Sequence, residues 1–244
     1  MTPPLRLVID DAQGAGRLTA ELVARLLSEL QNARSEARVI TLESNSEVFC
    51  TGLDLTLLSE QDEALSATVT GFAAVLREIE AAPRPVIALV DGAALGGGLG
   101  LACAADIVIA TTRATFGLPE TLFGLVPALV FPAIARRIGV ARARWLALSA
   151  ATISANDAWR IGLVDELTDE LETTLGRYLA RCERLDANAL AEVKSIASAF
   201  EADVIGYEAT AGARFKRVWN SPEARARIAR FNAGHSPWPE PGDA

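Results

Sequence analysis

Short apolar runs alternate with longer helical patterns over the first half of this 244-residue chain. Four runs have the length and the flanking turn residues of strands: Leu5–Ile9, Arg38–Leu42, Val86–Val90 and Asp106–Ala110. Apolar residues at helical spacing fill Thr19–Ala33, with Thr19 as the expected N-cap, and Ala64–Ala82. This strand–helix–strand succession, with mostly apolar strands, predicts an α/β core whose strands are buried.

Residues beyond about position 117 show almost no strand pattern and several helical ones. The expected helices are Leu129–Ile138, Arg142–Ala150, Ala155–Ile161, Asp169–Cys182, Asn188–Ala202 and Tyr207–Trp219. We therefore expect an α/β core over residues 1–170 and a helical C-terminal region over residues 171–244. Because no Gly/Ser-rich linker separates the two, the helices should pack on the core or on a neighbouring subunit.

The charge balance argues against two classes of partner. The chain carries 31 acidic and 23 basic residues, a net charge of -8, without a basic block or stripe. Binding to nucleic acid or to an anionic membrane surface needs such a block, so neither is expected. The N-terminus lacks the basic and apolar regions of a signal peptide, and the apolar stretches are too short to span a membrane. A cytoplasmic protein is expected.

Histidine and cysteine chemistry are also disfavoured. The single histidine, His235, lies in a Pro-rich tail, which a Ser-His-Asp or Cys-His site or a histidine metal site would have to recruit. Cys50, Cys103 and Cys182 are widely spaced and form no CxxC pair, which is typical of reduced thiols rather than disulfides or zinc ligands. No metal site is expected, so carboxylates and glycines remain as candidates.

Two segments, Glu47–Leu55 and Asp91–Ala102, place small residues directly after a strand. The second contains Gly96-Gly97-Gly98 ahead of a helix of small residues. That arrangement leaves backbone N–H groups uncovered at a helix N-terminus, where an anion or a developing oxyanion can bind. Close packing of the helix against the sheet explains the glycines equally well.

Two common phosphate-binding motifs do not fit this glycine run. A dinucleotide fingerprint, G-x-G-x-x-G, would place its third glycine on Leu101 or Cys103. A P-loop would need Gly-Lys-Ser/Thr after the glycines, and none follows. The run is therefore an anion site of another kind or a packing feature.

A third segment, Phe116–Pro127, carries Glu120 directly after Pro119 in a largely apolar stretch. Partial desolvation there would raise the pKa of Glu120 and suit it to proton transfer near neutrality. The alternative is a solvated glutamate in the first turn of a helix, favoured by the helix dipole. Asp54 and Asp91 adjoin the two glycine segments, and we interpret them as turn formers rather than as acids.

Taken together and in order, these segments resemble the crotonase (enoyl-CoA hydratase/isomerase) family. The motifs are FCTGLDL, DGAALGGGLGLACAADIVIA, FGLPETLFGLVP followed by ARRIG, and ISANDAWRIGLVDEL. The resemblance implies an α/β fold: a crotonase-type ββα spiral core with a helical C-terminal trimerisation region, in trimers or in hexamers. It also implies acyl thioester substrates on coenzyme A or on the phosphopantetheine arm of an acyl carrier protein, and no other cofactor.

The resemblance also implies a site. The backbone N–H groups of Leu53 and Gly97 form the oxyanion hole of the family, and Glu120 matches one of the two glutamates of its hydratases. The other glutamate falls on Gly100, so that carboxylate is missing. The resemblance further places a set of residues around the substrate: Gly52, Gly96, Gly98, Gly100, Leu125 and Pro127.

The missing carboxylate points to members that use one glutamate. The motifs are most similar to the dehydratases of polyketide β-branching cassettes, which convert a 3-hydroxy-3-methylglutaryl thioester on a carrier protein to the 3-methylglutaconyl thioester. Three alternatives stay open: a Δ3,Δ2-enoyl-CoA or enoyl-ACP isomerase/hydratase that uses a single glutamate, the decarboxylase of the same cassette, and a catalytically weak crotonase-fold subunit retained for assembly or binding. In the leading interpretation Glu120 abstracts the α-proton while Leu53 and Gly97 stabilise the enolate.

Arginine supplies nearly all of the positive charge and gathers in two places. The first group follows the Glu120 motif, and the second lies late in the chain: Arg136, Arg137, Arg142 and Arg144, then Arg214, Lys216, Arg217, Arg225, Arg227 and Arg230. The late group is a candidate contact for a phosphopantetheine phosphate or an acidic carrier domain. A solvated helix face explains most of these residues as well. The tail Pro237-Trp238-Pro239 either closes the acyl pocket or packs on a neighbour.

Overall fold

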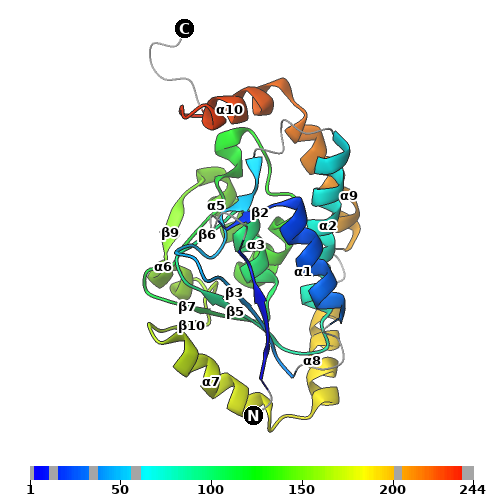
Figure 1. Ribbon diagram of the computed structural model, residues 1–244, viewed down its shortest axis with the longest axis vertical. Helices are drawn as coiled ribbons and strands as arrows, with labels where there is room; N and C mark the ends of the chain where they lie inside the picture. Colours follow the sequence, from blue (N-terminus) through cyan, green and yellow to red (C-terminus); the bar gives the residue numbers. More distant parts are fainter. Residues whose placement is uncertain (1–2, 11–15, 33–37, 56–61, 201–204, 238–244) are drawn as a thin grey trace.

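The computed structural model describes residues 3–10, 16–32, 38–55, 62–200 and 205–237 (Figure 1). Its main sheet is parallel, and the spatial order of the strands follows the chain: β1 (Leu5–Val8), β3 (Ile40–Glu43), β5 (Val86–Val90), β7 (Ile107–Ala110) and β10 (Glu166–Leu167). Four of these strands fall within or next to the runs expected from the sequence. Every residue of β5 is buried, as expected for a parallel sheet covered on both faces.

Helices α1 (Ala20–Asn32) and α2 (Asp62–Ala81) pack against each other beside the sheet (Figure 1). The amide of Leu22 donates a hydrogen bond of 3.1 Å to Thr19 Oγ1, so the expected N-cap of α1 is confirmed. Leu26 and Leu30 are buried on the same face of the helix, as the periodicity predicts.

Besides β10 of the main sheet, five short strands were not anticipated. They form two small sheets, β2 (Arg17–Leu18) with β4 (Gly52–Leu53), and β6 (Ala93–Leu95) with β8 (Thr115–Gly117) and β9 (Thr152–Ser154). Together with β10, β9 corrects the expectation that strands nearly end at about residue 117. Strands of two or three residues carry too few alternations to show a period. Of these strands, β4 contains Gly52 and β6 ends directly before Gly96, so their pairing positions the two glycine segments.

The second half of the chain is mainly helical, as expected. Helix α3 (Gly97–Ala104) precedes β7 and β8. The helices that follow β8 are η2 (Pro119–Phe123, a 3₁₀ helix), α4 (Phe131–Ile138), α5 (Val140–Ser149), α6 (Ala155–Arg160), α7 (Leu171–Cys182), α8 (Ala187–Phe200), α9 (Ile205–Trp219) and α10 (Pro222–Asn232). Helix α10 was missed by the sequence analysis. Its start has an ordinary signal, because Ser221 caps it by accepting from the Ala224 amide, with Pro222 following.

The C-terminal helices cover two separate parts of the core. Helix α7 buries Leu175 and Leu179 in one cluster with Ile87 and Ile109 of the sheet. Helices α9 and α10 lie at the other end in Figure 1 and pack around Leu125, beside the Glu120 motif. The division of the chain at residue 170 stays a prediction. Within the described residues, no helix is long and apolar enough to cross a membrane.

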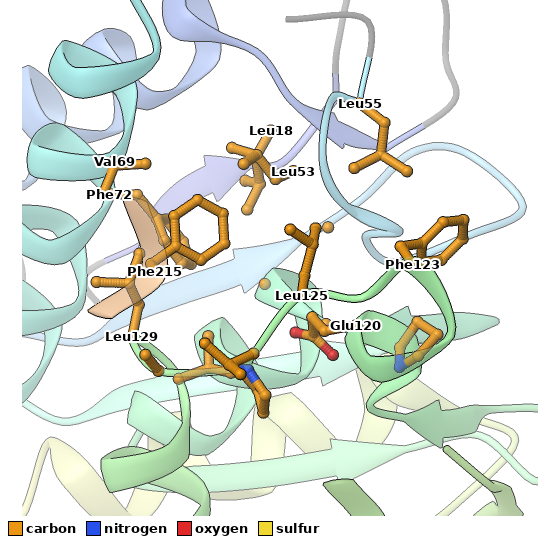
Figure 2. A pocket seen from close by; sticks show the side chains of 18 of the residues that line it. Leu18, Leu53, Leu55, Val69, Phe72, Glu120, Phe123, Leu125, Leu129 and Phe215 are labelled. Carbon is orange, nitrogen blue, oxygen red and sulfur yellow. The ribbon is translucent and has the colours of Figure 1, made fainter. Parts of the chain in front are cut away.

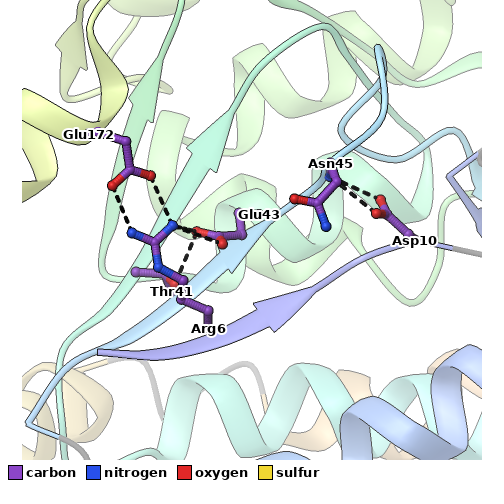
Figure 3. A network of polar contacts seen from close by, with 6 residues as sticks. All are labelled: Arg6, Asp10, Thr41, Glu43, Asn45 and Glu172. Carbon is purple, nitrogen blue, oxygen red and sulfur yellow. Dashed lines mark hydrogen bonds and ion pairs between the residues drawn. The ribbon is translucent and has the colours of Figure 1, made fainter. Parts of the chain in front are cut away.

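Arg6 ties helix α7 to the edge of the sheet (Figure 3). Its guanidinium donates to Glu172 Oε2 at 2.7 Å and to Glu43 Oε1 at 3.1 Å, so it joins β1, β3 and α7. At the other end of the same strands, the Asp10 carboxylate accepts from the Asn45 amide at 3.2 Å. These contacts tie β1 to β3 at both ends of the strands.

Candidate active site

The two glycine segments meet where β4 lies against the start of α3. A Cβ at Gly52 would lie 3.2 Å from the Gly97 nitrogen and 3.1 Å from the Leu95 carbonyl oxygen. The φ of Gly52 is +93°, a left-handed conformation that favours glycine. A side chain at this position would therefore push the two backbones apart, which explains why the chain places glycine there.

Backbone donors are available on both sides of this contact. Helix α3 begins without a side-chain cap, and the first amide to find an intrahelical carbonyl is that of Gly100, which donates to Gly96 at 3.0 Å. On β4, the Asp54 amide donates to the Leu18 carbonyl at 3.3 Å. Because successive amides of a strand point to opposite edges, the Leu53 amide points away from β2. Leu53 and Gly97 line one pocket.

Gly98 fits the other explanation of the glycine run, which is close packing of the helix. A Cβ there would overlap the Cys50 carbonyl oxygen. Gly98 and Gly100 pack behind the pocket and are absent from its described lining, whereas Gly52, Gly96, Leu125 and Pro127 line it. The glycine run therefore does both things: it opens the helix N-terminus on one side and lets the helix approach the chain on the other.

Glu120 lies beside the start of α3, in the short helix η2 directly after Pro119. Its Oε1 lies 3.1 Å from the position that a Cβ on Gly96 would occupy. Oε2 is buried and has no hydrogen-bond partner among the described residues. Burial raises the pKa of Glu120 to about 7, against the smaller lowering effect of a backbone hydrogen bond. The solvated-glutamate alternative is therefore wrong, and the expected desolvation is confirmed.

The pocket around Glu120 is almost entirely apolar (Figure 2). The pocket is partly open to solvent, and Glu120 is the one titratable residue of its described lining: Leu18, Thr51, Gly52, Leu53, Leu55, Val69, Phe72, Gly96, Gly97, Pro119, Glu120, Phe123, Leu125, Val126, Pro127, Ala128, Leu129, Val130 and Phe215. The sequence analysis missed the members from remote elements, such as Phe72 of α2 and Phe215 of α9. Both sit in ordinary amphipathic patterns that carry no signal of a pocket.

Gly100 stands where the hydratases of the family carry their second glutamate, and the Val130 side chain fills the space beside it. A Cβ at Gly100 would overlap Val130 Cγ1 and lie 2.7 Å from Val130 Cβ. Val130 is 3% exposed and lines the Glu120 pocket. The chain therefore lacks an acid at position 100 and also lacks the space for one.

The other acidic and sulfur-bearing candidates have structural roles. Asp91 accepts hydrogen bonds from Thr111 Oγ1 at 2.7 Å and from Arg113, whose guanidinium holds the pKa of Asp91 below its usual range. Asp54 lies 3.6 Å from the Arg17 guanidinium. The three cysteines are free and buried, and burial raises the pKa of Cys103 to about 12. Among the described residues, no group of His, Cys, Asp and Glu could hold a metal ion.

Most of the basic side chains singled out earlier bind within the protein. Seven contact a described acceptor: Arg136 with Glu80, Arg137 with Asp165, Arg142 with the Ile161 carbonyl, Lys216 with Ser66, Arg225 with Asn220, Arg227 with the Leu122 carbonyl and Arg230 with the Ser236 carbonyl. Arg144, Arg214 and Arg217 line one surface groove between α5 and α9, and Arg214 also has an interaction partner within the protein. That groove shares the Val126–Ala128 wall with the Glu120 pocket. In the tail, Pro237 is buried, and Trp238 and Pro239 lie outside the described residues.

The enoyl-CoA hydratase/isomerase family model matches residues 8–230. The chain belongs to this family. Bacillaene synthase dehydratase PksH of Bacillus subtilis (strain 168) is 32% identical over 208 residues, covering 84% of this chain and 80% of that protein. The 2,3-dehydroadipyl-CoA hydratase of Escherichia coli K12 is 33% identical over 186 residues, covering 72% of each chain. The crotonase resemblance is thereby confirmed, and the protein is an enzyme of the hydratase/dehydratase type.

Solved structures of the family share the fold of this chain. A Bacillus subtilis polyketide biosynthesis enoyl-CoA hydratase (PksH) superposes with a TM-score of 0.89 at 28% identity, covering 95% of this chain and 94% of that one. The predicted α/β crotonase fold is therefore confirmed.

Proposed function

We propose that this protein dehydrates a 3-hydroxy-3-methylglutaryl thioester, carried by an acyl carrier protein, to the 3-methylglutaconyl thioester in polyketide biosynthesis. The observation that carries the proposal is the pocket with one acid: Glu120 lies against the start of α3 in an otherwise apolar lining. The likeness to a bacillaene synthase dehydratase supports the same reaction class.

The first step is removal of the α-proton by the Glu120 carboxylate. The electron pair of the C–H bond then forms an enolate, whose oxygen accepts hydrogen bonds from the Leu53 and Gly97 amides. Each such donor contributes on the order of 3 kcal/mol in a preorganised site. A pKa near 7 suits this step, because Glu120 is partly ionised at neutral pH and still basic enough to take the proton.

The second step is loss of the β-hydroxyl. The enolate collapses, the Cα–Cβ double bond forms and the Cβ–O bond breaks. The proton held by Glu120 passes to the departing hydroxyl, which leaves as water, and the carboxylate is regenerated. One carboxylate therefore serves as base and then as acid on the same face of the substrate, and atoms and charge balance without a second protein acid. No metal and no cofactor other than the thioester carrier takes part.

Mass spectrometry of the carrier-bound substrate tests the reaction. Incubation of the 3-hydroxy-3-methylglutaryl carrier protein with the enzyme should remove one water from the acyl group, and E120Q should abolish this while keeping the fold. Loss of carbon dioxide from the dehydrated substrate would instead identify a decarboxylase. Retention of most activity by E120Q would contradict the assignment of Glu120.

A Δ3,Δ2-enoyl thioester isomerase is the second candidate, because moving a proton between two carbons needs only one carboxylate. The same pocket, with a single titratable group, fits that reaction. Supplying 3-enoyl thioesters on coenzyme A separates the two functions. Fast isomerisation without any dehydration of the branched hydroxyacyl substrate would favour the isomerase.

The carrier contact is proposed for the groove lined by Arg144, Arg214 and Arg217. All three are exposed on a protein of net charge -8, so the groove offers a local basic surface beside the pocket wall. Complementary charge at such a surface steers association with an acidic partner. We also propose a cytoplasmic trimer or hexamer, in which exposed apolar residues such as Val193 and Ile196 of α8 are covered by neighbouring subunits.

A further inference from the structure

Helix α3 presents two glycines, Gly96 and Gly100, on one face. They are four residues apart, and the Gly100 amide donates to the Gly96 carbonyl, so they occupy successive turns. Each bare backbone is covered by a side chain from residues 119–130. The Glu120 carboxylate lies over Gly96, and the Val130 side chain lies against Gly100.

Backbone hydrogen bonds at the start of α4 hold Val130 in place. It stands directly before α4, and its carbonyl accepts from the Ile134 amide at 3.2 Å. The Phe131 amide donates to the Pro127 carbonyl at 2.9 Å, which closes a turn around Val130. A β-branched side chain has restricted χ1 freedom, so its methyl groups cannot easily swing away from Gly100.

The stretch between the two contacts is also constrained. The Leu125 amide donates to the Glu120 carbonyl at 2.9 Å, and Gly124 ends η2 in the left-handed region. Thr121 Oγ1 donates to the Ala147 carbonyl of α5 at 3.0 Å. A displacement at residue 130 is therefore passed along the segment rather than absorbed by a loose loop.

We infer that Val130 is a positioning residue: by packing against Gly100, it sets where residues 119–130 lie on α3 and holds the Glu120 carboxylate over Gly96. The inference deepens the proposed function, and only its turnover measurements rest on that function. Val130 acts through Glu120 and need not touch the reacting atoms.

The geometry defines a set of variants. Gly100→Ala places a methyl group in the space of Val130 and should shift the segment. Adding V130A should not relieve this overlap, because the Cβ atoms of residues 100 and 130 would still be 2.7 Å apart. Adding V130G should relieve the overlap. The new Cβ at residue 100 would then meet only the Cα of residue 130, at 3.6 Å, which is an ordinary van der Waals contact. Glycine is acceptable directly before a helix.

Three outcomes are expected from the activity assay. G100A should lower kcat about 100-fold with little change in KM, the cost of a misplacement of about 1 Å. G100A/V130A should stay slow, whereas G100A/V130G should recover most of kcat. Gly176→Ala is the control, because Gly176 lies within α7 and a Cβ there meets nothing within 4 Å.

A second readout does not depend on turnover. The ionisation of Glu120 can be followed by carbon NMR of labelled glutamate, with E120Q as the blank. In G100A, water reaching the displaced carboxylate should move the pKa toward that of a solvated glutamate, and G100A/V130G should restore it. Glu120 is the one titratable side chain of the described pocket lining, so no neighbour there confounds the titration.

Two results would overturn the inference. One is a G100A variant with unchanged kcat and Glu120 ionisation. The other is a folded G100A/V130G variant, as stable as G176A, that stays as slow as G100A. If instead no variant or wild type dehydrates the branched substrate, while the Glu120 titration shifts as described, the proposed function fails and the positioning role stands.

Discussion

The Glu120 carboxylate lies against the bare backbone of Gly96, where a Cβ would stand 3.1 Å from Oε1. Gly96 also has a φ of +53°. Gly96→Ala should therefore push the carboxylate aside and strain the start of α3, with a loss in kcat of about 100-fold. Steady-state kinetics with the carrier-bound substrate measures this.

Gly162→Ala is the matched control for backbone strain. Gly162 has a φ of +80°, and a Cβ there meets nothing within 4 Å. It should lose some stability and keep its kcat. Equal losses of kcat in the two variants would show that strain alone, and not the contact with Glu120, explains the effect at Gly96.

Activity should rise with pH through the ionisation of Glu120. The carboxylate is the base, so the fraction of active enzyme grows as pH passes the pKa of about 7. A profile of log kcat/KM against pH should bend near that value. A profile that stays flat from pH 5 to pH 8 would be inconsistent with Glu120 as the base at this pKa.

The free energy of unfolding, in contrast to the activity, should fall as pH rises through the pKa of Glu120. The pKa of Glu120 is raised from an ordinary 4.5 to about 7 on folding, so between these values the folded protein binds more protons than the unfolded chain. Its contribution is present below the lower value and falls as pH rises toward the higher one. The E120Q variant has no carboxyl to titrate at this position. Between the two pKa values its free energy of unfolding should therefore rise relative to that of the wild type as pH increases, by about 3 kcal/mol at most. Urea unfolding of both proteins at several pH values measures the difference, and a constant difference would count against the buried ionisation.

Charge reversal in the arginine groove should weaken the use of carrier-bound substrate. R144E/R217E should lower kcat/KM for the carrier-bound thioester, more strongly at low salt, because charges at a docking rim act mainly on association. Turnover of a short thioester without a carrier should be unchanged. Arg184→Glu is the control, since Arg184 is an exposed residue next to α7, away from the groove. An equal loss with both thioesters would place the effect in the pocket rather than in docking.

The sequence predicts much of this molecule, and the parts it misses have a physical reason. Four of the five strands of the main sheet are apolar runs long enough to recognise, and the segments around Gly52, Gly97 and Glu120 stand out because glycine and a lone carboxylate are unusual among apolar neighbours. Desolvation of Glu120 could be anticipated from its surroundings. The contact between Gly100 and Val130 could not, because it joins a residue of α3 to the residue directly before α4, and the approach of these two helices is set by tertiary packing.

The same limit applies to the pocket wall. Phe215 reaches the Glu120 pocket from α9, nearly a hundred residues away in the chain. Its position in an amphipathic pattern shows that it is buried and says nothing about what it is buried against. The short strands β4 and β6 were missed for another reason: their conformation depends on backbone pairing with β2 and β8 rather than on side-chain alternation.

The strand order of the main sheet has a consequence for how the chain folds during its synthesis. Because β1, β3, β5, β7 and β10 lie side by side in the order in which they are synthesised, each new strand can join the edge left by the one before it. Until Glu166 and Leu167 arrive, the apolar strand β7 presents an open edge. A nascent or truncated chain ending before this point would expose a template for aggregation, which the completed chain covers.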